Sequence, residues 1–166
     1  MANPIRLTNK LLVCPQLQIE DLAALNAAGI RTIICNRPDS EGAGQPYAES
    51  IAAAARQLGM TFTHVPVTAK IEMTKDAVAQ FNEALESAPS EVVAYCRSGK
   101  RSAIMWALTQ RGKMPVEEIL RTTAQSGFDL GGMADRLVPE TEKSPAVETG
   151  ETAKKIGFWS RIFGRR

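Results

Sequence analysis

The hydrophobic positions of the chain fall into two kinds of pattern. Short apolar runs, typical of buried strands, occur at five places, and segments with helical periodicity lie between and after them. The predicted strands are residues 5–7, 11–14, 30–35, 61–65 and 92–95. The predicted helices are residues 21–28, 47–58, 74–88, 103–108, 115–125 and 130–137.

The order of these elements predicts an α/β fold. Strands that alternate with helices form a mainly parallel sheet flanked by helices, here in three α/β/α layers. The first two strands surround Asn9 and Lys10 and can instead pair as a hairpin. Right-handed crossovers bring the loops that follow the parallel strands to one edge of the sheet, where such folds hold their sites. We therefore expect the chemistry in those loops.

Composition and charge add a few limits. The chain has 166 residues, 44% hydrophobic and 23% charged, which suits one domain with its own core. Cys14, Cys35 and Cys96 have no metal-ligand spacing and form no even disulfide set, and there is one histidine. We expect no metal, no cofactor and no nucleic-acid partner. Because there is no apolar signal segment and no apolar run near 20 residues, we also expect a cytoplasmic setting.

The pattern changes after residue 138. Residues 1–138 are predicted to form the folded domain, and residues 139–150, rich in Pro, Glu, Thr, Ser and Gly, a flexible linker. Residues 151–166 are basic and aromatic, and as a helix they would align Ile156, Trp159 and Phe163 on one stripe. This tail is predicted to contact a membrane surface or a partner. The alternative is a last helix that packs back onto the domain.

The strongest chemical signal lies between residues 91 and 102. A strand ends at Cys96, a short loop containing Gly99 follows, and Ser102 can cap the next helix. Such a loop turns backbone N–H groups inward at a helix N-terminus, where they bind anions and stabilise a thiolate. Cys96 is therefore predicted to be a nucleophile, although a small apolar residue ending a buried strand is the alternative.

The basic residues around Cys96 support an anionic substrate. Cys96 and Arg101 are predicted to be catalytic, with Arg101 closing the loop. Arg37, after the strand at 30–35, could reach the same anion or could be a surface ion-pair partner. The full predicted anion-binding set is Arg97, Ser98, Gly99, Lys100, Ser102 and Arg37.

The spacing of this loop resembles that of rhodanese-type sulfurtransferases, which also place four residues between Cys and Arg. Cysteine-dependent protein phosphatases use a similar loop with five intervening residues, usually preceded by His, whereas Tyr95 precedes Cys96 here. In the number of residues between Cys and Arg, and in the lack of a His before the Cys, the loop is therefore similar to the loop of sulfurtransferases.

The wider chain resembles the phosphatase-like domain of beta-lactamase hydrolase-like proteins. The resemblance covers roughly residues 3–111 and rests on five blocks in order: residues 21–34, Asn36-Arg-Pro-Asp-Ser-Glu, Gly44-Gln-Pro, His64-Val-Pro-Val and the Cys96 loop. It implies a protein-tyrosine-phosphatase-like fold, with residues 1–138 as a phosphatase-like catalytic domain. Members of that family have been linked both to phosphatase-like hydrolysis and to sulfur transfer.

Two reactions and one non-enzymatic role are open at this point. We favour a sulfurtransferase that carries a persulfide on Cys96, taken from a persulfide or thiosulfate, because this reaction needs no general acid. The alternative is hydrolysis of a phosphate ester through a cysteinyl-phosphate on Cys96, with Asp39 or Glu72 as general acid. Asp39 also fits a turn-forming role. A non-catalytic anion-binding module is the third hypothesis, and the intact pair of Cys96 and Arg101 argues against it.

Overall fold

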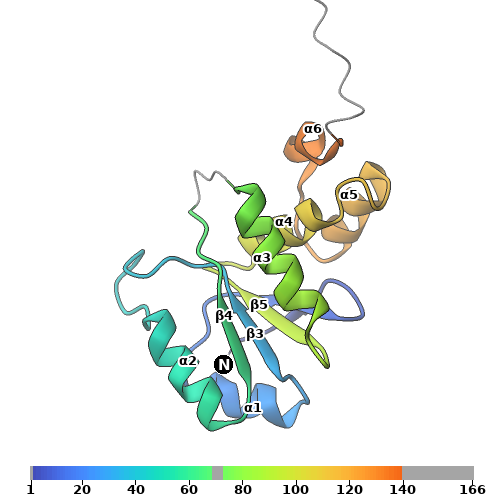
Figure 1. Ribbon diagram of the computed structural model, residues 1–166. Coiled ribbons are helices and arrows are strands. Elements are labelled where there is room, and N and C mark those ends of the chain that lie inside the picture. Colours follow the sequence, from blue (N-terminus) through green and yellow to red (C-terminus); the bar gives the residue numbers. More distant parts are fainter. Residues whose placement is uncertain (1, 69–72, 140–166) are drawn as a thin grey trace, which may run out of the picture.

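The computed structural model describes residues 2–68 and 73–139, and they form a five-stranded sheet between two layers of helices (Figure 1). The strand order is β1-β2-β5-β3-β4, in which β1 pairs antiparallel with β2 and the other neighbours are parallel. The predicted hairpin and the mainly parallel sheet are both confirmed. The strands are β1 (Ile5–Arg6), β2 (Leu11–Cys14), β3 (Thr32–Cys35), β4 (Thr61–His64) and β5 (Val92–Tyr95).

Strand β5 lies at the centre of the sheet, and its composition explains why. All four of its residues are buried, and their side chains alternate between the two faces. Val92 and Ala94 belong to the core on one face, and Val93 and Tyr95 to the core on the other. An apolar run without polar alternation is stable in this position, where helices cover both faces.

Helices cover both faces of the sheet, so the predicted three layers are confirmed. On one face, α1 (Asp21–Ala27) and α2 (Ala48–Gln57) contribute Leu22, Leu25 and Ile51 to the core. On the other face, Phe81, Met105 and Ile119 come from three further helices. The elements of this second layer are α3 (Lys75–Glu86), α4 (Lys100–Thr109), α5 (Val116–Gln125), the 3₁₀ turn η1 (Gly131–Met133) and α6 (Ala134–Leu137).

One predicted helix start is wrong. Helix α4 begins at Lys100, directly after Gly99, so Ser102 is a buried residue of the first turn and not the N-cap. Gly99 has a φ of +89°, a left-handed conformation that glycine adopts at low cost and that turns the loop straight into the helix. A Cβ at this position would also meet Phe128 at 3.2 Å.

The predicted linker and tail lie outside the described residues, except for Pro139. The domain boundaries near residues 138 and 151 therefore stay predictions. Within residues 2–68 and 73–139, no helix combines the length and the apolar character that crossing a bilayer requires.

Candidate active site

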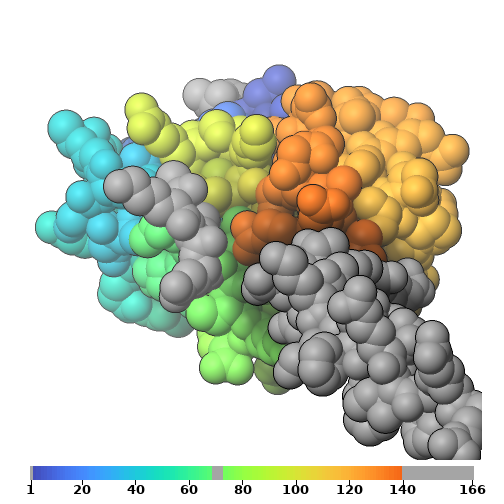
Figure 2. Space-filling model, turned by 90° about the horizontal axis from the view of Figure 1, so that it is seen from above, coloured from blue at the N-terminus to red at the C-terminus, as the bar shows by residue number. Residues whose placement is uncertain are grey.

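Loops from four strands meet at the carboxyl edge of the sheet. This is the edge that the parallel topology predicts for a site. Seen from above, the residues near 40 and the residues near 100 lie on the same face of the molecule (Figure 2). The side chains and carbonyls that meet there are Gln16 after β2, Arg37 and Glu41 after β3, Val67 after β4, and Cys96 and Arg101 after β5.

Cys96 directly follows β5 and lies four residues before the start of α4. Its Sγ accepts a hydrogen bond from the Gly99 N–H at 3.1 Å, and its own N–H donates to the Cys14 carbonyl at 3.4 Å. The residue is fully buried. A backbone N–H directed at the sulfur and the nearby helix N-terminus both place positive electrostatic potential beside the sulfur. These contacts support the prediction that Cys96 is the nucleophile.

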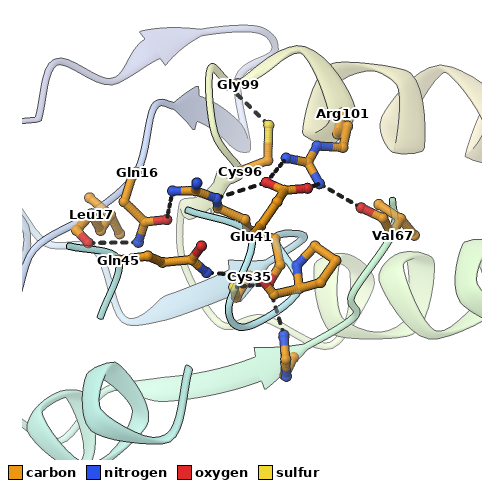
Figure 3. Close-up of polar contacts among 12 residues, drawn as sticks. Gln16, Leu17, Cys35, Glu41, Gln45, Val67, Cys96, Gly99 and Arg101 are labelled. Carbon is orange, nitrogen blue, oxygen red and sulfur yellow. Dashed lines mark hydrogen bonds and ion pairs between the residues drawn. The ribbon is translucent and has the colours of Figure 1, made fainter. Parts of the chain in front are cut away.

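Arg101 lies beside Cys96, in the first turn of α4, and is clamped by Glu41 (Figure 3). Its Nη1 and Nη2 donate to the two carboxylate oxygens of Glu41 at 2.8 and 2.6 Å. Nη1 also donates to the Val67 carbonyl at 2.7 Å. Arg101 is 8% exposed, and partners from two other loops fix the position of its guanidinium.

Arg37 is tied to the same carboxylate. Its Nε donates to Glu41 Oε2 at 2.9 Å, and its Nη1 donates to Gln16 Oε1 at 2.9 Å. Arg37 therefore forms an ion pair, as the alternative for this residue expected, and its partner Glu41, whose side chain is 24% exposed, also pairs with Arg101. Arg37 reaches the Cys96 region through Glu41, and a direct contact with substrate stays a prediction.

The contacts among Glu41, Arg37 and Arg101 shift the pKa values of Glu41 and Arg101. Hydrogen bonds from Arg101, and then from Arg37, hold the pKa of Glu41 below its usual value, so the carboxylate is charged at neutral pH. Burial acts to lower the pKa of Arg101, but the hydrogen bond to Glu41 and the proximity of Cys96 raise it overall. Arg101 therefore interacts with both the carboxylate of Glu41 and the sulfur of Cys96.

The remaining predicted anion ligands divide by exposure. Arg97, Ser98 and Lys100 are exposed at the rim of the loop, where they contribute positive charge. Gly99 is buried and supplies the N–H that contacts the sulfur. Ser102 is fully buried, and its Oγ has no hydrogen-bond partner among the described residues.

Of the two general-acid candidates, Asp39 and Glu72, the structure describes only Asp39. Asp39 Oδ1 accepts a hydrogen bond from the Ala48 N–H at 2.7 Å, which satisfies a backbone donor at the start of α2. This contact agrees with a structural role for Asp39 and gives no support to its assignment as an acid. Glu72 lies outside the described residues.

Glu41 is the site residue that sequence reasoning missed. It lies in the block Asn36-Arg-Pro-Asp-Ser-Glu, four residues after Arg37. The sequence offered one signal for its role: Glu41 is a carboxylate four residues after the basic Arg37, in a loop that follows a buried strand. Its main partner, Arg101, is 60 residues away in the chain, so the pairing could not be inferred from spacing.

Cys35 and His64 take structural roles. The Cys35 thiol donates to the Arg37 carbonyl at 3.4 Å, and burial raises its pKa, which keeps the thiol protonated. Burial likewise raises the pKa of Cys14. His64 Nε2 contacts the same Arg37 carbonyl at 3.0 Å. Together, Cys35 and His64 hold the backbone at the start of the loop after β3.

Comparison with known proteins identifies the family. The sequence profile of the phosphatase-like domain of beta-lactamase hydrolase-like proteins matches residues 5–113. The chain belongs to this family. Beta-lactamase hydrolase-like protein from Xylella fastidiosa strain Temecula1 is 28% identical over 145 residues, which cover 86% of this chain and 33% of the relative. The chain thus spans about a third of the length of that relative.

Solved structures similar to this phosphatase-like domain give the same fold. A provisionally assigned phosphatase from Neisseria meningitidis Z2491 is 38% identical, with a TM-score of 0.71 over 80% of this chain and 94% of the other. Kinase associated phosphatase, solved with its catalytic-site cysteine replaced by serine, has a TM-score of 0.61 at 15% identity, over 82% and 91% of the two chains. The protein-tyrosine-phosphatase-like fold is therefore confirmed, and these relatives favour the phosphatase alternative over the sulfurtransferase hypothesis.

Proposed function

We propose that this domain is a phosphatase-like hydrolase that cleaves a phosphate ester through a covalent intermediate on Cys96. The observation that carries the proposal is the buried Cys96 sulfur, which accepts the Gly99 N–H beside the clamped Arg101 guanidinium. The thiolate attacks phosphorus, an S–P bond forms, and the P–O bond to the leaving group breaks. Water then attacks the cysteinyl-phosphate, releasing inorganic phosphate and the thiolate.

Arg101 has the electrostatic role in this reaction. The phosphoryl group carries negative charge on its oxygens through both steps, and a fixed guanidinium stabilises that charge without reorganising. The exposed Arg97 and Lys100 at the rim raise the local concentration of anionic substrate.

Protonation of the leaving group limits the choice of substrate. Asp39 is engaged at the start of α2, and Glu41 is held ionised by two arginines, so neither is a ready proton donor. Substrates whose leaving group is stable as an anion, such as aryl or acyl phosphates, are therefore the preferred class. Glu72 remains the candidate acid for esters with poorer leaving groups.

Sulfur transfer is a second candidate, and one feature favours it. Only four residues separate Cys96 from Arg101, so the loop is tighter than one with five and suits a smaller group. In this reaction the thiolate attacks the outer sulfur of thiosulfate, an S–S bond forms on Cys96, and sulfite leaves. A thiol or cyanide acceptor then takes the outer sulfur.

A side-by-side assay tests the proposal. Wild type and Cys96→Ser are compared with p-nitrophenyl phosphate and with thiosulfate plus cyanide. We expect Cys96-dependent release of phosphate from the ester. If the wild type releases none, and intact mass after thiosulfate shows one added sulfur of about 32 Da on Cys96, sulfur transfer replaces hydrolysis.

A further inference from the structure

A groove of about 460 Å³ lies in the second helical layer, lined by residues of α3, α4 and α6. Helix α4 packs against both of the other helices (Figure 1). The groove takes Leu108 and Thr109 from the last turn of α4, whereas Cys96 lies before the first turn. Because eight residues of helix, about 12 Å, separate Lys100 from Leu108, the groove is distinct from the candidate active site.

The lining of this groove combines apolar and basic side chains. Three of its members are partly buried and pack against the core, namely Met73, Val78 and Leu108. No aspartate or glutamate among the described residues lines it. Its charged members are all cationic: Lys75, Arg111 and Arg136. An acidic peptide with a few small apolar residues is therefore the occupant that its chemistry suits.

The chain continues into an acidic segment directly beside the groove. Pro139, the last described residue, follows α6 and lies beside Gly112, where an added Cβ would be 3.7 Å from the proline ring. Gly112 is the neighbour of the lining residue Arg111. Residues 140–151 contain four glutamates and one lysine. Twelve residues of extended chain span about 40 Å, which is ample for a groove of this volume.

Charge distinguishes this segment from the rest of the C-terminal chain. Residues 152–166 carry five basic residues and no acidic one, so the basic lining of the groove repels them. Residues 140–151 have the opposite sign, and Pro145, Ala146 and Val147 offer small apolar surfaces to the apolar part of the lining. Charge complementarity therefore selects the acidic segment and not the amphipathic tail.

We propose that residues 140–151 dock within their own chain in the groove between α3, α4 and α6. Their glutamates pair with the basic residues of the lining, and the Pro-Ala-Val stretch covers its apolar residues. A covalently attached segment has an effective concentration on the order of millimolar, so even weak contacts keep it bound. The docking goes beyond the reaction on Cys96 and does not depend on it. It fixes the place where the basic tail leaves the domain.

Zero-length cross-linking of the full chain tests the docking. A carbodiimide joins a carboxylate to a lysine amine only where the two groups touch. Lys75 is the first residue of α3, and Lys10, which donates to the carbonyl of the last residue Glu86, is the control at the other end of the same helix. We expect glutamates of residues 140–151 to link to Lys75 at least about tenfold more often than to Lys10. A mixture of ¹⁴N- and ¹⁵N-labelled protein identifies links within one chain.

A charge swap in the full chain gives an independent readout by amide hydrogen exchange. Lys75→Glu with Arg136→Glu should speed exchange of residues 140–151 by about three- to tenfold, as should about 0.5 M salt. Glu142→Lys with Glu148→Lys should do the same, and all four changes together should restore protection. Arg121→Glu is the matched control, because Arg121 is an exposed residue of α5 outside the groove. Its exchange should equal that of the wild type.

Slow exchange in β5 verifies that each variant is folded. Should the reversed groove fail to fold, Lys75→Gln with Arg136→Gln removes the two charges without reversal, and a smaller rise in exchange is expected. Unprotected residues 140–151 in the wild type would overturn the proposal. Links that join two chains would assign the groove to a second copy, and protection confined to residues 152–166 would assign it to the tail. Either result would also overturn the proposal.

Discussion

The loop after β5 and the loop after β3 both border the site, but they are built in different ways. Between Tyr95 and Lys100 the first loop has four residues, and its shape follows from Gly99 and the contact of its N–H with Cys96. The second loop runs over residues 36–47 and is ordered by side chains that bond to partners outside the loop, two of them distant in the chain. The short loop carries the proposed nucleophile, and Glu41 of the long loop pairs with the neighbouring Arg101. Local geometry thus places the proposed reactive group, and long-range contacts place the guanidinium beside it.

The largest effect should come from Cys96→Ser in the short loop. Loss of a nucleophile removes the covalent path, and we expect activity on p-nitrophenyl phosphate to fall by at least about 10³-fold. Cys35→Ser is the matched control, because the Cys35 thiol is kept protonated and faces the Arg37 carbonyl. Initial rates per folded molecule measure both. If Cys35→Ser were inactive and Cys96→Ser active, the nucleophile would be misassigned.

A comparison of two arginines of the same loop should come next. Arg101→Lys loses the planar fork and its paired bonds to Glu41, and we expect a loss of about 10- to 100-fold in kcat/KM. Arg97→Lys keeps an exposed positive charge and should stay within about threefold of the wild type. Steady-state kinetics at two salt concentrations measure both variants. Equal losses would show that the critical guanidinium is placed wrongly.

Gly99→Ala tests whether local backbone geometry alone maintains the short loop. The φ of +89° is strained for alanine, and the added Cβ would lie 3.2 Å from Phe128. We expect a loss of stability of about 1–2 kcal/mol together with reduced activity. Thermal unfolding gives the first quantity and initial rates the second. The matched control is Gly59→Ala, at a φ of +71° with open space around the Cβ, which should lose stability and keep its activity.

Asp39→Asn should have a smaller effect and tests the long loop. Asparagine can still accept the Ala48 N–H, so stability should change by less than about 1 kcal/mol, and kcat should stay within about twofold. A general acid at this position would instead cost about 10²- to 10⁴-fold in kcat, most of all for alkyl phosphates. A comparison of aryl and alkyl esters in both proteins decides between the two roles.

The smallest effect is expected from removing residues 140–166. Both hydrophobic cores of the described domain are made of residues up to Leu137, so a chain ending at Pro139 should fold and keep its kcat/KM. The predicted contact of the tail with anionic membranes would be lost, which sedimentation with anionic liposomes measures. An unfolded truncated protein would show that the tail belongs to the core.

Much of this fold could be predicted because its determinants are local. The apolar run of β5 and the glycines that end α1 and α2 can be recognised in a few neighbouring residues. The same holds for Thr74, whose hydroxyl accepts the Ala77 N–H at the start of α3. The predicted start of α4 is wrong. Ser102 is a residue type preferred at the N-cap, but Gly99 takes that position in the structure and the helix begins at Lys100.

The sequence by itself determined that a cysteine would end a central strand at a helix N-terminus, with basic residues around it. Only the tertiary structure decided that Glu41 pairs with both Arg101 and Arg37. It also decided that Asp39 faces α2. The physical reason is distance along the chain. Strand and helix patterns depend on neighbours, whereas Gln16, Glu41 and Arg101 meet only because the parallel topology brings the ends of β2, β3 and β5 to one edge.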